Sequence, residues 1–232
     1  MKKVACYCGT RNLYHLMIPA VKSLIYNTTV DEVYLLIEDD KFPHLMPDFV
    51  KTINISNQQF FPDDGPNMDS WFTYMALIRG ALHRIFPDLD RILSLDVDTI
   101  FIQPCSEIWD FDLGDEYYFA AVREPKCCVQ NLLYCNAGVS LYNLKLLRES
   151  GKGDEVIDVL NRRKYPNDIQ DVYSFLCQGH ILEIPSMYNV NNFAEPTVEK
   201  KIAHYAGYSD WTRKQEFVKY NIMSWEDVLV RR

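Results

Sequence analysis

The sequence predicts an α/β fold in which helices cover both faces of a mostly parallel, twisted central sheet. The first observation is that short apolar runs alternate with segments whose apolar residues recur at helical spacing. The second is the length of 232 residues, which suits one α/β domain with a single core. The third is a composition of 48% hydrophobic and 24% charged residues, close to the globular average. We therefore expect one domain over residues 1–232.

The chain begins with three predicted strands and one helix. Val4–Cys8 is an apolar run that ends at Gly9–Asn12, which is typical of a strand followed by a turn. Apolar residues then recur at helical spacing over Tyr14–Tyr26. A second strand is predicted over Glu32–Glu38 and a third, weaker one over Lys51–Ile55. This order of strands and helix favours parallel pairing.

A longer helix and a buried strand are predicted in the middle of the chain. Helical spacing over Trp71–Phe86 ends at Pro87, which cannot continue a helix. Arg91–Leu95 is apolar enough for a buried strand. Beyond it the sequence predicts two strands, two helices and a polar loop suited to lie over a site: Tyr117–Val122, Gly138–Tyr142, Asn143–Glu149, Glu155–Arg162 and Asn189–Thr197.

Two carboxylates follow the buried strand directly, as Asp96-Val97-Asp98. Ligands of open parallel sheets collect at the carboxyl ends of the strands, where this pair is expected. Residues two positions apart in an extended chain point the same way, so both carboxylates can share one hard cation. Such a cation neutralises a phosphate group and the charge on a leaving group. The alternative is that one Asp caps a turn and the other is solvated.

Charge and cysteine content exclude several classes of protein. The formal net charge of −8 leaves no basic face for a phosphate polymer, so we expect no nucleic-acid partner. The seven cysteines form no C-x-x-C pair, which argues against a zinc knuckle or a thioredoxin-type motif. Cys127, Cys128 and Cys135 could ligate a metal, although their spacing fits no standard site. We favour free thiols in a reducing cytosol.

The ends of the sequence bear on location. Met1–Tyr7 runs directly into a predicted strand and lacks the apolar stretch of a signal peptide. No segment has the length and hydropathy of a membrane helix, so we expect a cytoplasmic protein. The basic end, Arg231-Arg232, is too short to argue for membrane attachment, and peripheral membrane contact and oligomeric state stay open.

The acidic pair is part of a longer motif. The segment Leu93–Thr99 resembles the donor-site motif of glycosyltransferase family eight, a retaining family. Arg79 precedes Asp96 by seventeen positions, the spacing typical of the family's donor-binding arginine. Further matches follow in the family's order, from Val4 to Trp211 overall: Glu124, Asn136-Ala137-Gly138-Val139 and His204-Tyr205-Ala206-Gly207.

This resemblance implies a GT-A fold with a nucleotide-binding half at 1–100 and a sugar and acceptor half at 101–232. It also implies a divalent ion held by Asp98, His204 and one oxygen of Asp96. Imidazole beside carboxylates suits Mn²⁺ better than Mg²⁺, although Mg²⁺ remains an alternative. The implied reaction is transfer of a hexose, glucose or galactose, from a nucleotide diphosphate sugar to a saccharide or other hydroxyl acceptor, with UDP as the expected nucleotide.

The resemblance assigns further residues to the donor and acceptor. The expected sugar contacts are Arg79, Glu124, Asn136, Ala137, Gly138, Gln170 and Asp171. The expected nucleotide contacts are Cys8, Thr10, Asn12, Tyr14, Asp96, Val97 and Gly207, and the expected catalytic residues are Gln170, Asp168 and Arg79. Alternatives are a surface salt bridge for Arg79, a turn at Asn136 and a structural role for His204.

Three departures from the family pattern matter. Ile169 stands where the family's D-Q-D segment has its first Asp, so Asp168 compensates for it or simply begins a helix. Thr10 and Leu13 replace the family's base-reading Asp and stacking Tyr, for which Tyr14 is a substitute. The family's K-P-W is also missing after Gly207, and Arg213 or Lys214 are candidates to replace its phosphate-contacting lysine.

Two rival functions fit parts of the pattern. A nucleotidyltransferase also combines an α/β sheet with acidic metal ligands, and Cys8-Gly9-Thr10-Arg11 is a thin version of its basic, glycine-rich loop. A carbohydrate-binding module that has lost turnover would explain the altered D-Q-D and the missing lysine. Dependence of nucleotide-sugar hydrolysis on Mn²⁺ discriminates between transfer and binding alone.

Overall fold

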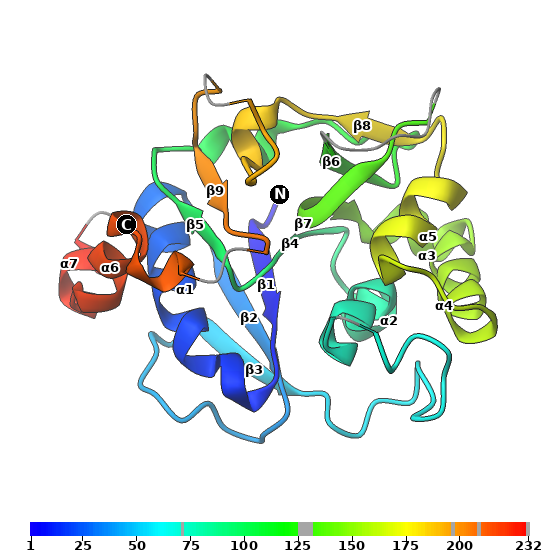
Figure 1. Ribbon diagram of the computed structural model, residues 1–232, viewed down its shortest axis with the longest axis horizontal. Helices are drawn as coiled ribbons and strands as arrows, with labels where there is room; N and C mark the ends of the chain where they lie inside the picture. The colour runs from blue at the N-terminus through cyan, green and yellow to red at the C-terminus, as the bar shows by residue number, and fades with distance from the viewer. Residues whose placement is uncertain (71, 125–131, 196–197, 208–209, 231–232) are drawn as a thin grey trace.

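The computed structural model describes residues 1–232 except 71, 125–131, 196–197, 208–209 and 231–232 (Figure 1). The possible ligands Cys127 and Cys128 and the basic end Arg231-Arg232 lie outside the described residues. Trp71, where a helix was predicted to begin, also lies outside them, as does the end of the predicted loop at 196–197. In the described part, no helix combines the length and hydropathy needed to cross a bilayer.

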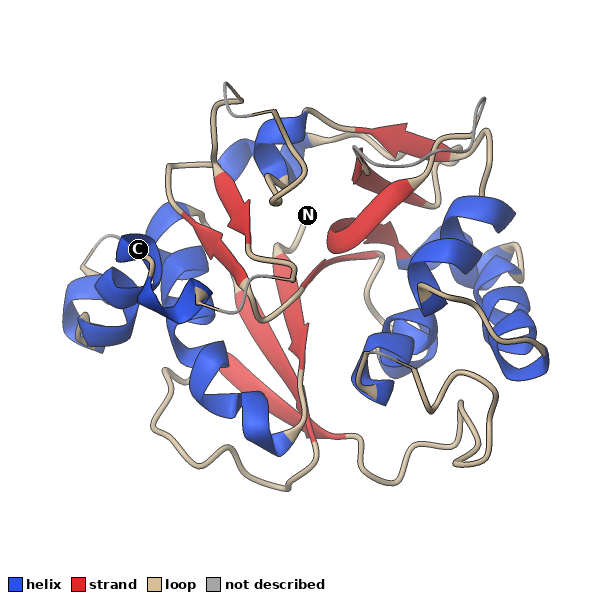
Figure 2. Cartoon of the chain, in the orientation of Figure 1, coloured by secondary structure: helices blue, strands red, loops and turns tan. Residues whose placement is uncertain are grey.

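A seven-stranded sheet forms the centre of the molecule (Figure 2). Its strands, in spatial order, are β3 (Val50–Asn54), β2 (Glu32–Ile37), β1 (Val4–Cys8), β4 (Arg91–Leu95), β7 (Cys135–Asn143), β6 (Phe119–Arg123) and β8 (Ile181–Glu183). Only β7 runs against its neighbours, because it pairs antiparallel with β4 and β6 while the other pairs are parallel. The predicted mostly parallel sheet is therefore confirmed.

Helices cover both faces of this sheet (Figure 1). One face carries α1 (Tyr14–Asn27), α6 (Gln215–Ile222) and α7 (Trp225–Leu229), and the other carries α2 (Leu82–Ile85), α3 (Leu144–Glu149), α4 (Lys152–Arg162) and α5 (Asp168–Leu176). Short 3-10 turns connect them: η1 (Arg11–Leu13), η2 (Tyr74–Ala81), η3 (Ser106–Asp110), η4 (Ser186–Tyr188) and η5 (Trp211–Arg213). The predicted α/β architecture is confirmed, although α6 and α7 were not predicted and α5 was only the alternative interpretation of Asp168.

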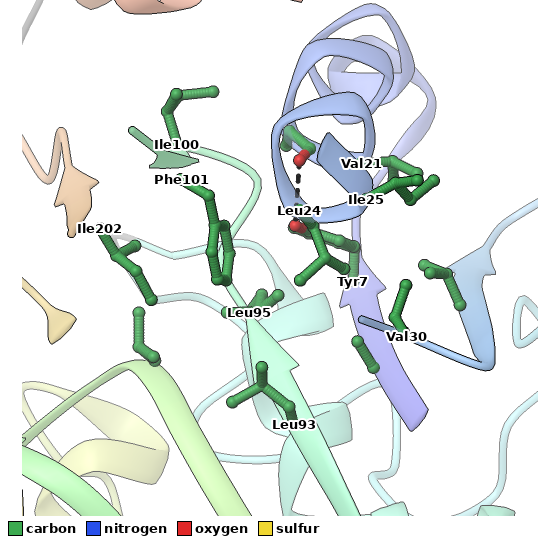
Figure 3. Close-up of a cluster of buried hydrophobic side chains, with 14 of the residues drawn as sticks. Tyr7, Val21, Leu24, Ile25, Val30, Leu93, Leu95, Ile100, Phe101 and Ile202 are labelled. Atoms are coloured by element: carbon green, nitrogen blue, oxygen red, sulfur yellow. Dashed lines mark hydrogen bonds between the residues drawn. The ribbon is translucent and has the colours of Figure 1, made fainter. Parts of the chain in front are cut away.

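The period of two along β1 divides the core between the two faces of the sheet. Ala5 and Tyr7 belong to the cluster on the α1 side, whereas Val4 and Cys6 belong to the cluster on the opposite side. Figure 3 shows the α1 side, where the Tyr7 hydroxyl donates a hydrogen bond of 3.3 Å to the carbonyl of Ala20. Burial on both faces explains why these strands read as continuous apolar runs.

A second, two-stranded sheet brings distant parts of the chain together. Strand β5 (Thr99–Phe101) pairs antiparallel with β9 (Ile202–His204), and Thr99 lies opposite His204 (Figure 1). Because β5 begins directly after Asp98, this pairing brings His204 beside the acidic pair. The sequence did not predict β9, since three residues carry too little periodicity.

The predicted helix over Trp71–Phe86 is wrong in type for most of its length. The chain forms the 3-10 segment η2 over Tyr74–Ala81 and becomes α-helical only over Leu82–Ile85. In this segment Gly80 lies close to α5, since a Cβ atom there would lie 3.1 Å from Ile169, and the side chain of Arg79 turns inward to Asp96. Long 3-10 runs are uncommon, and they often mark functional segments.

Candidate active site

The acidic pair lies at the carboxyl end of β4, as predicted. The carbonyl of Asp96 accepts hydrogen bonds from the backbone N–H of Thr99, at 3.1 Å, and from its hydroxyl, at 2.7 Å. The backbone N–H of Asp96 donates to the carbonyl of Gly138 at 2.9 Å. These bonds close a tight turn between β4 and β5, which fixes the backbone of both aspartates while their side chains remain partly exposed.

His204 completes a candidate metal centre with these two carboxylates. Its Nε2 atom lies 3.6 Å from a carboxylate oxygen of Asp96 and 3.4 Å from one of Asp98. One ligand atom from each of the three residues lies within 4.8 Å of the other two, so a single ion can contact all three. Carboxylate oxygens and an imidazole nitrogen form a donor set that suits a divalent transition metal. The residues present therefore fit the expected ion.

The imidazole is held by a second set of contacts. Nδ1 of His204 lies 2.8 Å from the side-chain oxygen of Asn189, which directs Nε2 at the aspartates. The ring packs directly on Gly138, where a Cβ atom would lie 2.2 Å from Cε1 of the ring. Gly138 is required here because any side chain would displace the imidazole.

The charges of His204 and Asp98 support each other. Burial alone lowers the pKa of His204, but the charge of Asp98 and its hydrogen bond outweigh burial and raise the pKa above its usual value. Burial likewise raises the pKa of Asp98, and the His204 charge outweighs it, so that the net shift is downward. Each of these two groups therefore favours the charged form of the other.

Arg79 is a buried group at the floor of the site. One nitrogen of its guanidinium donates to Asp96 at 2.8 Å and to the carbonyl of Ala137 at 2.8 Å. Burial lowers its pKa, yet the nearby Asp96 outweighs this effect and the net shift is upward, so the charge is retained. The residue is 7% exposed, which rules out the alternative of a surface salt bridge.

A groove passes over this floor. A hollow of about 250 Å³ on one side contains Cys8, Val97 and Leu13 among its lining residues. A second hollow of about 270 Å³ on the other side contains Asn136, Gly138 and Gln170. Both are lined by Phe72, Ala76, Arg79, Asp96 and Asp98. The acidic pair therefore lies at the junction of two adjoining hollows, a shape that suits a ligand with two dissimilar ends.

The start of β7 forms one wall of the second hollow. Asn136 donates to the carboxylate of Glu124 at 2.8 Å, and its side-chain oxygen accepts from Asn189 at 2.9 Å. The backbone N–H of Ala137 donates to the side-chain oxygen of Gln170 at 3.0 Å. The register between β6 and β7 shifts at this level, between Ala121 and Arg123. Irregular pairing of this kind re-aims side chains and is frequent beside active sites.

Asp168 lies at the start of α5, also in the second hollow. It has a φ of 42°, in the left-handed region that non-glycine residues rarely adopt. One carboxylate oxygen accepts from the hydroxyl of Ser70 at 2.6 Å, and the other is buried with no hydrogen-bond partner among the described residues. Burial raises the pKa of Asp168. The neighbouring Ile169 is 1% exposed and packs in the core, so it contributes no polar group.

Some residues expected at the site lie elsewhere. Tyr14 is 4% exposed, and its hydroxyl is engaged by the Glu38 N–H and by Asp39, so its ring offers no face to a base. The expected stacking role of Tyr14 is therefore wrong. Arg213 forms an ion pair with Asp210 at 3.9 Å and lines a hollow that shares no residue with the groove.

The remaining expected residues lie near the groove without lining its two hollows. Thr10 and Asn12 bond to each other after β1, and Gly207 follows β9 with a φ of 73°, which requires glycine. Asp171 accepts hydrogen bonds from the hydroxyl of Tyr134 and the N–H of Asn167, and it faces a third hollow. We therefore do not assign Asp171 to the donor sugar.

Sequence reasoning missed several residues of the site. Asn189 holds His204, Ser70 holds Asp168, and Phe72 lines both hollows with 47% of its surface exposed. The predicted polar loop at 189–197 was the only signal for Asn189. No sequence signal indicated Ser70 or Phe72, because the path of the chain before η2 is what brings them to the groove.

Comparisons with known proteins agree with this geometry. The sequence profile described as Glycosyl transferase family 8 matches residues 20–218. A putative glycosyltransferase of Haemophilus influenzae is 26% identical over 180 residues, which cover 66% of this chain and 54% of the relative. The chain therefore spans about half the length of that relative.

Solved structures of glycosyltransferases share the fold. The galactosyltransferase LgtC, solved with donor and acceptor sugar analogs, superposes with a TM-score of 0.70 at 18% identity over 99% of this chain and 100% of LgtC. The glycosyltransferase GlyE of Streptococcus pneumoniae TIGR4 gives a TM-score of 0.74 at 19% identity over 99% of this chain and 62% of GlyE. At these identities the likeness concerns the fold.

Proposed function

Because the chain belongs to glycosyl transferase family 8, we propose that it transfers a hexose from a nucleoside diphosphate sugar to a hydroxyl group of a saccharide acceptor, with retention of anomeric configuration. The observation that carries this proposal is the convergence of Asp96, Asp98 and His204 at the junction of two hollows, directly beside the buried guanidinium of Arg79. A diphosphate at this junction would leave a nucleoside on one side and a sugar on the other.

We propose Mn²⁺ as the cofactor, with Asp96, Asp98 and His204 as its ligands. When bound, the ion neutralises the diphosphate and stabilises the charge that develops on it as the glycosidic bond breaks. Mg²⁺ is a weaker candidate because it prefers an all-oxygen shell with several waters. Asn189 supports the centre by fixing the orientation of the His204 ring.

The two hollows divide the donor between them in this proposal. The hollow beside Cys8, Leu13 and Val97 receives the nucleoside, with UDP as the favoured nucleotide. The hollow beside Asn136 and Gly138 receives the hexose, glucose or galactose. Amide and carboxylate groups in this second hollow suit hydroxyl recognition, since they offer both donors and acceptors.

Transfer then requires a hydroxyl oxygen at the anomeric carbon. We propose that the acceptor oxygen attacks from the face on which the diphosphate leaves, that the bond from the anomeric carbon to the phosphate oxygen breaks, and that the hydroxyl proton passes to that phosphate oxygen. Arg79 contributes positive charge beneath the departing group. Asp168 and the amide of Gln170 face the same hollow, where a carboxylate stabilises the positive charge of an oxocarbenium-like centre.

A panel of nucleotide sugars tests the proposal. We expect Mn²⁺-dependent thermal stabilisation and slow hydrolysis with one or a few donors, and transfer products that keep the anomeric configuration of the donor. Asp98→Asn should reduce turnover by at least about 100-fold without unfolding the protein, because it removes a charged ligand. Unchanged turnover in Asp98→Asn would sink the metal-site argument. Binding of donors without any hydrolysis or transfer would favour a carbohydrate-binding module.

We also propose that the protein works in a reducing compartment such as the cytoplasm. The thiols of Cys6, Cys8, Cys105 and Cys177 are free. Burial raises the pKa of Cys105 and of Cys177 to about 12, so these two thiols are poorly reactive and behave as core residues.

A further inference from the structure

A third hollow continues the groove beyond the proposed sugar site. It has a volume of about 650 Å³, more than either of the other two. It shares Glu124, Asn167, Gln170 and Phe193 with the second hollow, so the two are joined along one wall. A molecule bound in the third hollow would therefore reach the boundary where Gln170 faces the donor sugar.

Aromatic side chains give this third hollow the character of a sugar site. Phe175 and Phe193 are 45% and 40% exposed, and both line the hollow together with Tyr134 and Tyr165. Large aromatic surface that remains open to solvent is costly unless a partner covers it. The apolar C–H face of a pyranose ring suits such a surface, while its hydroxyls reach the polar rim.

Two cations at its rim lack acidic partners. Arg163 and Lys164 line the hollow, both are exposed, and neither pairs with a carboxylate within 4.0 Å among the described residues. Lys164 donates to the backbone carbonyl of Asp69 at 3.2 Å, and the guanidinium of Arg163 lies 5.6 Å from the centre of the Tyr165 ring. Lys164 also lies near enough to Asp168 to lower its pKa slightly. In a chain of net charge −8, two adjacent cations of this kind stand out.

The two acidic groups of the third hollow are bound by neutral donors and not by its two cations. The two oxygens of Asp171 already accept hydrogen bonds from Tyr134 and Asn167. The carboxylate of Glu124 accepts from Asn136 at 2.8 Å and from Asn191 at 3.4 Å, on the side of the donor sugar. These carboxylates are engaged by neutral donors, so they do not occupy Arg163 and Lys164, which stay available at the rim.

We propose that the third hollow binds the acceptor, and that Arg163 and Lys164 select an acceptor sugar that carries a carboxylate or a phosphate. This inference rests on the proposed transferase function and adds the charge class of the acceptor. The acceptor hydroxyl lies at the Gln170 boundary and forms the new bond to the anomeric carbon. The donor's glycosidic bond to phosphate breaks, and the hydroxyl proton leaves with the diphosphate.

The test compares anionic sugars with neutral counterparts from which they differ only at carbon 6. Methyl β-glucuronide and methyl β-glucoside, together with glucose 6-phosphate and glucose, are measured for binding by ligand-observed NMR and for transfer in the presence of the best donor. We expect each anion to bind about tenfold more tightly than its neutral counterpart at low salt, and the advantage to shrink at high salt because screening weakens exposed charge pairs. The two pairs separate recognition of a carboxylate from recognition of a phosphate.

Variants assign the preference to the two cations. The double variant Arg163→Gln, Lys164→Gln should abolish the preference, with the neutral sugar as internal reference and a thermal melt as a check of folding. Arg162→Gln is the matched control, since Arg162 precedes this pair, pairs with Asp158 and does not line the hollow. It should keep the full preference.

The outcomes separate this inference from the proposed function. Turnover of a donor without any preference for anionic sugars, or with a preference that survives in the double variant, would overturn the acceptor inference alone. Absence of donor hydrolysis and transfer would overturn the proposed function, while the NMR binding series would still decide the charge preference of the hollow. A preference lost in Arg162→Gln would assign it to general surface charge and overturn the role of Arg163 and Lys164.

Discussion

The end of the groove at the metal centre and the end at α5 both contain buried charged groups. The two ends accommodate these charges in opposite ways. At the metal end, Asp96 and Asp98 lie between the guanidinium of Arg79 and the imidazole of His204, and each group is held by at least one partner. At the α5 end, Asp168 has one oxygen without a partner among the described residues and a backbone in the left-handed region. Charge is balanced at the first end and left unbalanced at the second.

This difference shows at which end of the groove the arrangement needed for function lowers the stability of the fold. At the metal end each acidic group has a partner, so removing one of these groups leaves another unpaired and lowers stability. The conformation and burial of Asp168 cost free energy of folding, and strain of this kind persists where the surrounding structure enforces it, often at functional sites. We therefore expect changes at the metal end to lower stability and function together, whereas changes at Asp168 should lower function and raise stability.

The largest expected effect tests the α5 end. Asp168→Asn should lower kcat by about 100-fold because it removes the charge that faces the anomeric carbon. Since burial raises the pKa of Asp168, the ionised folded state is disfavoured, and the variant should gain unfolding free energy at pH 7. The effect of pH on stability is opposite to that of a carboxylate with a lowered pKa. The wild-type protein is most stable below the unperturbed pKa of Asp168, and its stability falls as the pH rises to the raised pKa. The gain should thus vanish below about pH 3.9.

Chemical denaturation at pH 7 and at pH 3.5, beside kinetics with the best donor, measures both effects. Asp158→Asn, an exposed change on α4, serves as the control for loss of one negative charge. A variant with lower stability at pH 7 and normal kcat would show that Asp168 is a structural residue that begins a helix.

A smaller effect is expected from crowding the metal end. Gly138→Ala places a Cβ atom against the His204 ring, at 2.2 Å from Cε1, so the ring must shift. Metal affinity should fall by about 30-fold, within the range seen when the support of a ligand is disturbed. Stability should fall by about 2 kcal/mol, as in overpacked cores. Titration calorimetry with Mn²⁺ and a thermal melt measure the two losses.

Gly153→Ala is a matched control for this change. A Cβ atom there would lie 2.6 Å from the ring of His83, a histidine on the far side of η2 that pairs with Asp154. It should disturb an imidazole and the stability of α4 while leaving Mn²⁺ affinity intact. Equal losses of metal affinity in both glycine variants would mean that the effect is global.

The smallest effect is expected at Ser70. Its hydroxyl bond lowers the pKa of Asp168 against the upward effect of burial, so Ser70→Ala should raise that pKa further. If the ionised carboxylate is the active form, the acidic limb of the pH–kcat profile moves to higher pH. We expect about a fivefold loss at the low end of the profile and little change at its plateau.

Ser70→Thr keeps a hydroxyl and should restore the wild-type profile. A uniform loss at every pH in Ser70→Ala would instead indicate that the chain around Phe72 has loosened, because Ser70 also bonds to the backbone of Phe72.

Much of this architecture is predictable from the sequence. Buried strands such as Val4–Cys8 and Arg91–Leu95 carry continuous apolar runs, and the acidic pair that ends β4 follows from its position. Arg79, Gly138 and His204 were expected from the resemblance to the family's motifs, and the structure brings them together around Asp96. The apolar pattern predicts where a buried strand ends, so a motif at that end can be placed from the sequence.

The rest depends on contacts between distant segments. Local propensity does not record the 3-10 winding of η2 or the close approach of Gly80 to Ile169. The left-handed backbone of Asp168 and the choice between it and Ile169 likewise appear only when α5 meets η2. Asn189 reaches His204 through the three-residue strand β9, which is too short to predict.

The register of the β4–β7 pair determines which side chains face the site. In the observed register Leu95 lies opposite Val139, which puts Gly138 beneath His204 and Asn136 toward Glu124. Since strand side chains alternate, a slip of one residue would present Val139 to the imidazole and turn Asn136 away. Such a molecule could keep most of its sheet and still be inert. We therefore expect the active fraction of a preparation to equal the fraction of molecules in which β4 and β7 pair in the observed register.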